Sequence, residues 1–304
     1  DPKNIKNINE RKIRKGFEKL GPTFIKLAQI LSLRGDFYNK NILRELEKLQ
    51  TETICFNFKA IKIIIEQALS KNINVLFKKI NKNPLSSASV AQLHSAVMQN
   101  GDKVIIKIIK PNTKNLIYSD LKVIALIFNI LILFKKFDRF KLLDVLDELK
   151  NTFNNELNLK YEAANISKFR HLFNKDQYVY APNVYWHLSS ENILVMEYVD
   201  GINILNKNKL KKEQINKTTI IFQLIEIFYT QFLKYNFFHA DMHPGNILIS
   251  KSNLGKNVII LIDFGIVSFM ENKQKYYIIE NILAFTKMDY KKIIQLHINA
   301  KTIK

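Results

Sequence analysis

The stretch FFHADMHPGNILIS, residues 237–250, and the stretch VIILIDFGIVSF, residues 258–269, decide which fold this sequence predicts. They place Asp241 and Asn246 five residues apart on one short loop, and they place Asp263 directly before Phe-Gly at the end of an apolar run. Carboxylate and amide oxygens are the hard ligands that magnesium prefers. The pattern therefore predicts a site that holds a divalent cation and phosphate.

The spacing of these residues fits phosphoryl transfer. That reaction needs a carboxylate near the acceptor hydroxyl and oxygen ligands for magnesium beside the phosphates. An Asp-x-x-x-x-Asn loop with a later Asp-Phe-Gly supplies these groups in the order that kinases use. The alternative is a pair of turn-forming residues beside Pro-Gly. His239 and His243 lack a Cys or a further acidic residue at zinc spacing, so we expect structural roles for them.

Composition narrows the class of protein and its partners. The 304 residues and 47% hydrophobic content are ordinary for globular domains, and the single cysteine excludes an internal disulfide framework. The longest charge-free apolar run, residues 123–134, predicts a buried or interfacial helix because it is too short to span a bilayer. The net charge of +20 favours an anionic partner or reflects a composition rich in Lys, Ile and Asn. We expect no nucleic-acid partner, since no nucleic-acid-binding motif is present.

The order of predicted elements indicates an α+β fold in two lobes. Gly21-Pro22 separates two predicted helices near the N-terminus, and helices are also expected over residues 40–80, 114–173 and 210–236. Strands are expected at residues 102–111, 191–201 and 258–262. We divide the chain into an N-terminal helical extension, an N-lobe and a C-lobe that we expect to be truncated, with bounds 1–80, 81–200 and 201–304.

Lys107 is a lone cation inside the alternating apolar pattern KVIIKII. A buried lysine is costly unless it is paired, whereas a lysine on an edge strand protects a sheet against aggregation. Helical projection of NELNLKYEAANISKF places Glu162 within an apolar stripe, and glutamate is rarely buried without a partner. Pairing of the two side chains would account for the burial of both charges. We therefore predict a Lys107–Glu162 pair in which the lysine contacts ATP phosphates.

The strand predicted at residues 191–201 occupies the place of the connection between kinase lobes. In that place Met196 lies behind the adenine of ATP, and backbone groups of Glu197 and Val199 bind the edge of the base. The alternative is an ordinary buried strand. The position of this segment between Lys107 and the aspartate-rich loop favours the adenine-binding interpretation.

The glycine-rich loop of protein kinases is missing before Lys107. Residues 86–96 read SSASVAQLHSA in its place. We expect backbone N–H groups of Ala88, Ser89 and Val90 to lie over the phosphates, with less conformational freedom than glycine allows. The chain therefore differs from a typical protein kinase.

Taken in order, these segments resemble the UbiB/ADCK atypical kinase-like proteins that are associated with ubiquinone biosynthesis. The resemblance runs from about residue 16 to residue 270. It rests on GPTFIKLAQILSLRGD, SSASVAQLH, VIIKIIKP, NELNLKYEAAN, LVMEYVDG, FFHADMHPGNIL and LIDFG. Several matches in order are more specific than any one of them, and they imply a two-lobed protein-kinase-like fold with an N-terminal helical extension.

The resemblance also implies roles for individual residues. Asp241 takes the place of the catalytic aspartate, and Asn246 and Asp263 take the places of the magnesium ligands. Lys26 and Gln29 belong to the helix of the N-terminal extension that projects into the cleft, where Lys26 acts in catalysis with Glu156 as its partner and Gln29 lies at the nucleotide. Lys107 and Glu162 keep the roles already given.

The family further implies a cellular setting. Its members are associated with binding and hydrolysis of ATP and with quinone synthesis at a membrane. The implied cofactors are ATP and Mg²⁺, and the implied partners are anionic lipid, a quinone-like small molecule and other proteins of ubiquinone biosynthesis. The implied location is peripheral, at the cytoplasmic or matrix face of a bacterial inner or organellar membrane.

Three residues depart from the family pattern. Ala28 stands where the family has Gly, Asn158 stands where it has Asp, and Met242 stands where Pro is usual. We expect altered or weaker activity from these changes. Two other functions compete: a small-molecule phosphotransferase of the aminoglycoside or choline kinase type, and a non-catalytic nucleotide-binding scaffold. The segment LGPTFIKLAQILSLRGD disfavours the phosphotransferase, and assays of ATP binding and turnover separate the scaffold.

Overall fold

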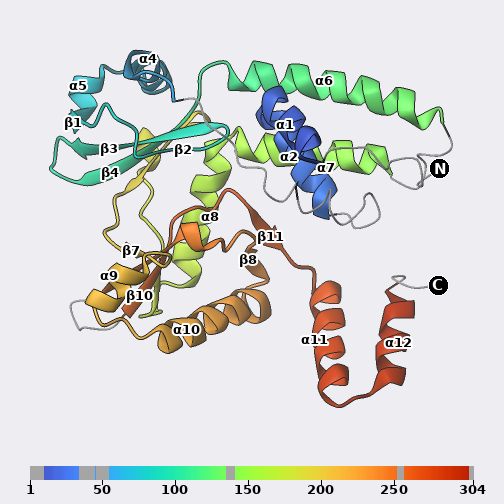
Figure 1. Cartoon of the computed structure of the whole chain (residues 1–304). Helices are drawn as coiled ribbons and strands as arrows, with labels where there is room; N and C mark the ends of the chain where they lie inside the picture. The colour runs from blue at the N-terminus through green and yellow to red at the C-terminus, as the bar shows by residue number, and fades with distance from the viewer. Residues whose placement is uncertain (1–9, 34–44, 46–54, 135–140, 252–256, 301–304) are drawn as a thin grey trace. The chain divides into compact units, whose positions relative to one another are not determined.

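The protein is described by a computed structural model that covers residues 10–33, 45, 55–134, 141–251 and 257–300 (Figure 1). The chain divides into two compact units, each built from helices and strands. Unit 1 comprises Asp1–Ala163 and Val184–Tyr198, and unit 2 comprises Ala164–Asn183 and Val199–Lys304. The mixed content of both units agrees with the predicted α+β class.

Two short helices open the described chain of unit 1. Gly21 separates α1 (Glu10–Leu20) from α2 (Pro22–Leu33), and its φ of +98° lies in the left-handed region where glycine is favoured. Ile25 and Ala28 of α2 are buried against apolar residues of α1. The methyl group of Ala28 therefore contributes to the packing of these two helices.

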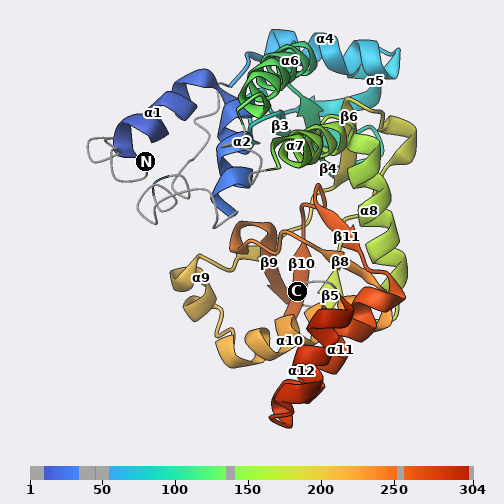
Figure 2. The ribbon, with the colours of Figure 1, turned by 90° about the vertical axis from the view of Figure 1, so that its right-hand side faces the viewer.

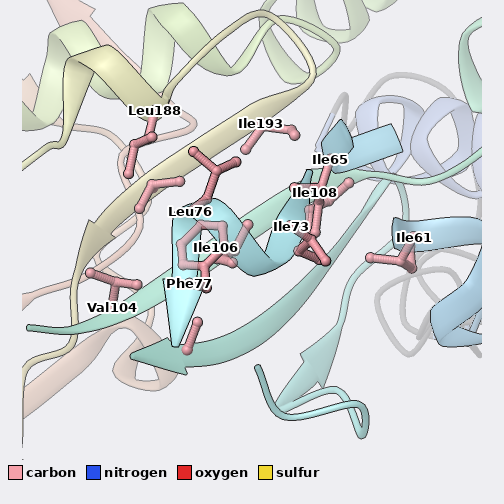
Figure 3. Packing of buried hydrophobic residues seen from close by; sticks show 12 residues of the cluster. Ile61, Ile65, Ile73, Leu76, Phe77, Val104, Ile106, Ile108, Leu188 and Ile193 are labelled. Carbon is pink, nitrogen blue, oxygen red and sulfur yellow. The ribbon is translucent and has the colours of Figure 1, made fainter. Parts of the chain in front are cut away.

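An antiparallel sheet forms the centre of unit 1. Its strands run in the order β1-β3-β4-β6, with β2 paired to β3. Their bounds are β1 (Phe77–Ile80), β2 (Ser86–Ser87), β3 (Ala91–Met98), β4 (Lys103–Ile109) and β6 (Ile193–Glu197). One face of the sheet packs against α4 (Phe58–Leu69) and α5 (Ile73–Leu76), and Figure 3 shows the resulting cluster of isoleucine, leucine, valine and phenylalanine side chains.

Two strands of this sheet differ from the sequence prediction. Residues 77–80 form β1 although we expected helix up to residue 80, and residues 91–98 form β3 although their small and polar side chains did not predict a strand. Polar side chains of β3 point into the core, where the Gln92 amide bonds the backbone N–H and carbonyl of Phe56 at 3.0 and 3.1 Å. Pairing with distant segments therefore overrides local preference in both strands.

The helical region predicted from residue 114 to residue 173 is divided into three helices, with residues 135–140 outside the described part. These are α6 (Thr113–Ile132), α7 (Leu142–Glu156) and α8 (Leu159–Leu172). Asn158 breaks the last two apart, and its side-chain oxygen accepts a bond from the N–H of Lys160 at 3.1 Å. Asparagine therefore serves as the N-terminal cap of α8. A 3₁₀ turn, η3 (Trp186–Leu188), precedes β6.

Unit 2 holds a four-stranded sheet and a separate two-stranded pair (Figure 2). The larger sheet has the order β5 (Val179–Tyr180), β10 (Asn257–Leu261), β9 (Ile247–Lys251) and β7 (Ile202–Asn203). The pair consists of β8 (Phe237–His239) and β11 (Val267–Phe269). The helices and turns are α9 (Lys207–Lys212), α10 (Lys217–Tyr229), η4 (Thr230–Lys234), η5 (Pro244–Asn246), α11 (Asn272–Thr286) and α12 (Tyr290–Asn299).

Truncation of Ile106 to alanine tests the core of unit 1. Ile106 is fully buried in β4, so Ile106→Ala is expected to lower the free energy of unfolding by about 2–5 kcal/mol through lost burial and a new cavity. The matched control is Ile63→Ala, because Ile63 of α4 is 54% exposed. Urea unfolding followed by circular dichroism measures both variants. An equal loss in the two would show that the core does not depend on β4.

Candidate functional site

The Lys107 ammonium and the Glu162 carboxylate form a buried ion pair in unit 1. Their atoms Nζ and Oε1 are 2.7 Å apart, and the side chains are only 11% and 5% exposed. The apolar stripe that predicted the burial of Glu162 is itself buried, as shown by Leu159 and Ala163 on the same helix. Each charge offsets the desolvation of the other. The structure thus brings together the two residues that the sequence predicted as partners.

Lys107 lies on the face of the sheet opposite the apolar cluster. The strand register places Lys107 opposite Leu93 and Leu194, and it places Ile105 opposite Met196, so these residues share one face. Leu93 and Ile105 are only half-buried, whereas the alternate positions of β4 are fully buried. This sheet face of unit 1 is therefore partly open at Leu93 and Ile105, beside the buried Lys107 and Met196.

A groove of about 670 Å³ opens beside this face. Its lining includes Ser95 and Val97 of β3, Lys103 of β4 and Tyr198, the residue that follows β6. The N–H of Tyr198 donates to the carbonyl of Lys103 at 3.0 Å, which extends the pairing of β4 and β6 by one residue. Glu197 and Val199 flank Tyr198, so the two residues predicted to bind the edge of adenine lie next to the groove lining in sequence.

Lys110 holds the alanine-rich loop, and the sequence analysis missed this role. Its Nζ donates to the carbonyl of Ala88 at 2.6 Å, and its backbone N–H donates to the carbonyl of Val90 at 2.9 Å. The loop also closes on itself, since the N–H of Ala88 donates to the carbonyl of Ala91. Burial lowers the pKa of Lys110. A lysine directly after the end of a buried apolar strand was the sequence signal for this contact.

The predicted polar residues of α2 are also placed in unit 1. The Lys26 ammonium lies 2.5 Å from the carboxylate of Glu156, the last residue of α7, and both side chains are largely buried. The second carboxylate oxygen of Glu156 is buried without a hydrogen bond. Gln29 lies on the same helix and is half-buried. The predicted Lys26–Glu156 pair therefore forms, and it anchors α2 to α7.

In unit 2 the aspartate-rich loop runs from β8 through η5 to β9. Asp241 is exposed, and Asn246 and Asp263 are half-buried. The backbone N–H of Ile262 donates to the carbonyl of Asn246 at 3.2 Å, and the Asn246 amide donates to the carbonyl of Asp241 at 3.4 Å. These bonds join the loop at Asp241 and Asn246 to the backbone of Ile262, the residue directly before Asp263.

Phe264 anchors the Asp-Phe-Gly segment. Its ring is fully buried and lies 5.0 Å from the ring of Phe169 and 4.8 Å from that of His239. The amide of Asn165 donates to the carbonyl of Phe264 at 3.0 Å. The Asp263 carboxylate accepts a bond from the N–H of Gly265 at 3.0 Å, so the segment is fixed by its own turn and by two residues of α8.

The two histidines of the loop act as local hydrogen-bond acceptors. Nδ1 of His239 accepts from the N–H of Asp241 at 3.1 Å, and Nδ1 of His243 accepts from the N–H of Gly245 at 3.0 Å. Burial lowers the pKa of His239, although Asp263 and Asp241 act in the opposite direction. The accepted bond and the lowered pKa both favour a neutral ring. These bonds agree with the structural roles that the sequence predicted.

The side chains of this loop fit magnesium better than zinc. Among the residues that the structure describes, no three of His, Cys, Asp and Glu lie together in a metal-binding group. Asn246 and Asp263 offer an amide oxygen and a carboxylate, and magnesium is commonly held by one or two carboxylates together with water and substrate phosphates. Such a set suits a metal that arrives with a nucleotide.

Comparisons with known proteins also indicate a kinase-like protein. The ABC1 atypical kinase-like domain matches residues 48–297. Proteins named probable protein kinase UbiB from Marinobacter nauticus and Blochmanniella pennsylvanica are 36% and 39% identical to the chain, over 95% and 96% of its length. The alignments cover 53% and 54% of those proteins, so the chain spans about half the length of the curated relatives it matches.

A solved structure supports the fold. The Rv3197–erythromycin complex from Mycobacterium tuberculosis superposes with a TM-score of 0.65 over 92% of this chain and 69% of that chain, at 20% sequence identity. The two-lobed α+β kinase-like fold predicted from the sequence is therefore confirmed. The domain match and the relatives named UbiB show that the chain belongs to the ABC1 atypical kinase-like family, and it is of the UbiB type that its ordered motifs indicate.

Proposed function

We propose that this chain is an atypical kinase-like ATPase that binds Mg-ATP and supports ubiquinone biosynthesis at a membrane. The observation that carries the proposal is the buried Lys107–Glu162 pair on a partly open face of the sheet. A buried ion pair is rarely the most stable choice for a core. A cation held in place at the margin of an open face is explained by an anionic ligand, and ATP phosphates are such a ligand.

The proposal gives each predicted site residue a role. Lys107 contacts the ATP phosphates and Glu162 fixes its position, while Ala88, Ser89 and Val90 present backbone N–H groups. Met196 lies behind the adenine, whose edge the backbone on either side of Tyr198 binds. The groove beside Ser95 supports this assignment, since it lies along the same sheet face.

The groups of unit 2 supply the remaining parts. Asn246 and Asp263 would hold magnesium, which neutralises charge on the phosphates when it is bound. Asp241 is exposed on the loop and would orient the attacking hydroxyl or water. Lys26 and Gln29 act at the nucleotide from α2. The Lys26–Glu156 pair supports a defined position for that helix.

The cellular role follows from the relatives named UbiB. We propose that the protein acts peripherally at the inner face of a bacterial inner or organellar membrane. Its proposed partners are anionic lipid, a quinone-like small molecule and other proteins of ubiquinone biosynthesis. The net charge of +20 supports an anionic surface, since basic side chains near such a surface each contribute about 1 kcal/mol.

Magnesium-dependent ATP binding and hydrolysis test the proposal. Lys107→Met and Asp263→Asn are each expected to reduce turnover by at least about 100-fold, because electrostatic stabilisation of the transferred phosphoryl group is lost. Lys78→Met on β1 of the same sheet is the matched control, since Lys78 is exposed and lies outside the lining of the groove, and it should keep wild-type turnover. ATP binding without turnover in the wild-type protein would instead support the non-catalytic scaffold.

The Lys107–Glu162 pair also predicts a stability effect that is independent of nucleotide. Glu162→Leu removes the carboxylate that pairs with the buried Lys107 ammonium at 2.7 Å, which is expected to lower the free energy of unfolding by about 3–5 kcal/mol. The double variant Lys107→Met/Glu162→Leu should recover most of that loss while remaining unable to bind ATP. Urea unfolding without nucleotide measures the cycle. Equal stability of Glu162→Leu and wild type would contradict the buried pair.

Lys110 is expected to position the alanine-rich loop. Lys110→Met removes a hydrogen bond from a charged donor, worth about 1.5–3 kcal/mol, and should weaken ATP binding by roughly tenfold or more. Lys110→Arg should restore most of the affinity because it keeps a cationic donor. Isothermal titration with a non-hydrolysable ATP analogue measures both. Unchanged affinity in Lys110→Met would show that the loop does not need this contact.

A further inference from the structure

The helix α6 exposes a long apolar face. Its exposed large side chains include Leu126 at 62% and Ile130 at 50%, and Leu133 just after the helix is 80% exposed. The other apolar side chains of this face are Leu116, Val123, Ile127 and Phe134. Large exposed apolar patches on folded proteins mark interaction sites.

This face carries almost no polar group in its second half. Between Lys122 and Lys135 the sequence contains no charged residue, and Asn129 is the polar residue exposed among the apolar ones. In the first half Lys122 is exposed and supplies positive charge, whereas Lys114 is half-buried and pairs with Glu191 at 3.8 Å. Asp120, the acidic residue of α6, accepts a bond from the buried hydroxyl of Thr23 at 2.6 Å. The solvent side of the helix is therefore apolar, with one exposed lysine near its middle.

The opposite side of α6 is packed into unit 1. Ile117, Leu121, Ile124 and Phe128 are buried, and α6 contacts α2 and α7, which lie on the same side of it in Figures 1 and 2. The helix is long and apolar enough to cross a membrane by length and composition, yet these contacts tie one side of it to protein. A helix held in this way can lie along a membrane surface without crossing it.

On two other apolar surfaces of the described residues, charged side chains stand among the apolar ones. The exposed face of α10 combines Phe222 and Ile225 with the exposed carboxylate of Glu226. The turn between α11 and α12 exposes Met288 beside Lys287 and Asp289. A protein partner usually meets a surface with a polar rim and hydrogen bonds. A strip about 18 Å long, from residue 123 to residue 134, with one polar side chain fits acyl chains better.

We propose that the exposed face of α6 is an interfacial membrane-binding surface that lies parallel to an anionic bilayer. Its apolar side chains enter the boundary between headgroups and acyl chains, and the exposed Lys122 meets anionic headgroups. The partner is lipid, in agreement with the net charge of +20. This inference rests on the membrane part of the proposed function and assigns that part to one helix.

Vesicle flotation tests the surface directly. The probe is vesicles of phosphatidylcholine with about 30% phosphatidylglycerol, and vesicles of phosphatidylcholine alone are the comparison. Only the first kind offers the helix both apolar contact and negative charge. The variant is Leu126→Asp/Ile130→Asp. We expect at least a tenfold loss of binding, since loss of about 1.4 kcal/mol of apolar burial already gives this factor. Wild-type protein should bind the anionic vesicles and bind neutral vesicles more weakly.

A matched control uses α10 in unit 2. Phe222→Asp/Ile225→Asp changes two side chains that are 67% and 47% exposed, close to the 62% and 50% of Leu126 and Ile130. This control should bind vesicles like the wild type. Circular dichroism and unfolding midpoints should be unchanged in both double variants because all four side chains are exposed. Equal losses in the two variants, or no loss in the α6 variant, would overturn the assignment to α6.

A second readout reports contact with lipid. In a Cys55→Ser background, Leu126→Cys labelled with the fluorophore NBD should show a blue shift and stronger emission on anionic vesicles. The same label at Phe222→Cys should not. Sedimentation without lipid tests whether a second copy of the chain covers this face. If the wild type is a dimer and Leu126→Asp/Ile130→Asp is a monomer, the partner of the face is protein and the assignment to lipid is overturned. If wild-type protein binds no vesicle, the membrane part of the proposed function fails together with this surface, while ATP turnover tests the remainder separately.

Discussion

The ion pair of Lys107 and Glu162 is the constraint on which much of unit 1 depends. A lysine and a glutamate taken out of water must meet at hydrogen-bonding distance, because either one alone would leave a buried charge. The pair therefore fixes the beginning of α8 against β4 at 2.7 Å. Farther along α8, residues that belong to unit 2 hold the carbonyl and ring of Phe264. One helix thus carries a contact for each half of the proposed nucleotide chemistry.

Polar contacts replace glycine in the loop that is expected to cover the phosphates. A glycine-rich loop adopts its shape through backbone freedom. This chain has alanine and serine there, and the Lys110 side chain holds the carbonyl of Ala88. On the neighbouring strand the Gln92 amide bonds the backbone of Phe56 within the core. Because each of these polar groups has a partner, the sheet can hold them without the cost of unsatisfied burial.

Membrane association and nucleotide chemistry use different surfaces in this interpretation. The exposed apolar face of α6 lies opposite the side that packs against α2 and α7, and Lys26 of α2 pairs with Glu156 of α7. The same three helices therefore carry a proposed lipid contact on one side and a proposed nucleotide residue on another. Thr23 and Asp120 join α2 to α6 through a short buried hydrogen bond. Lipid contact at α6 is thus connected to α2 by direct packing and a specific bond.

The sequence alone determined the family through its ordered motifs, and it determined the Lys107–Glu162 pair because the cost of burying each charge can be judged from the apolar residues around it. The role of Asp241, Asn246 and Asp263 at a metal stays a prediction. Sequence could not determine that residues 91–98 form a strand, since the partners that satisfy Gln92 lie 36 residues away. The bond from Lys110 to Ala88 spans 22 residues and was equally hidden. The run from 123 to 134 predicted a buried or interfacial helix without choosing between them. Only the packing of α2 and α7 decided which side of that helix is buried and which remains apolar and exposed, because burial is set by contacts between segments far apart in the chain.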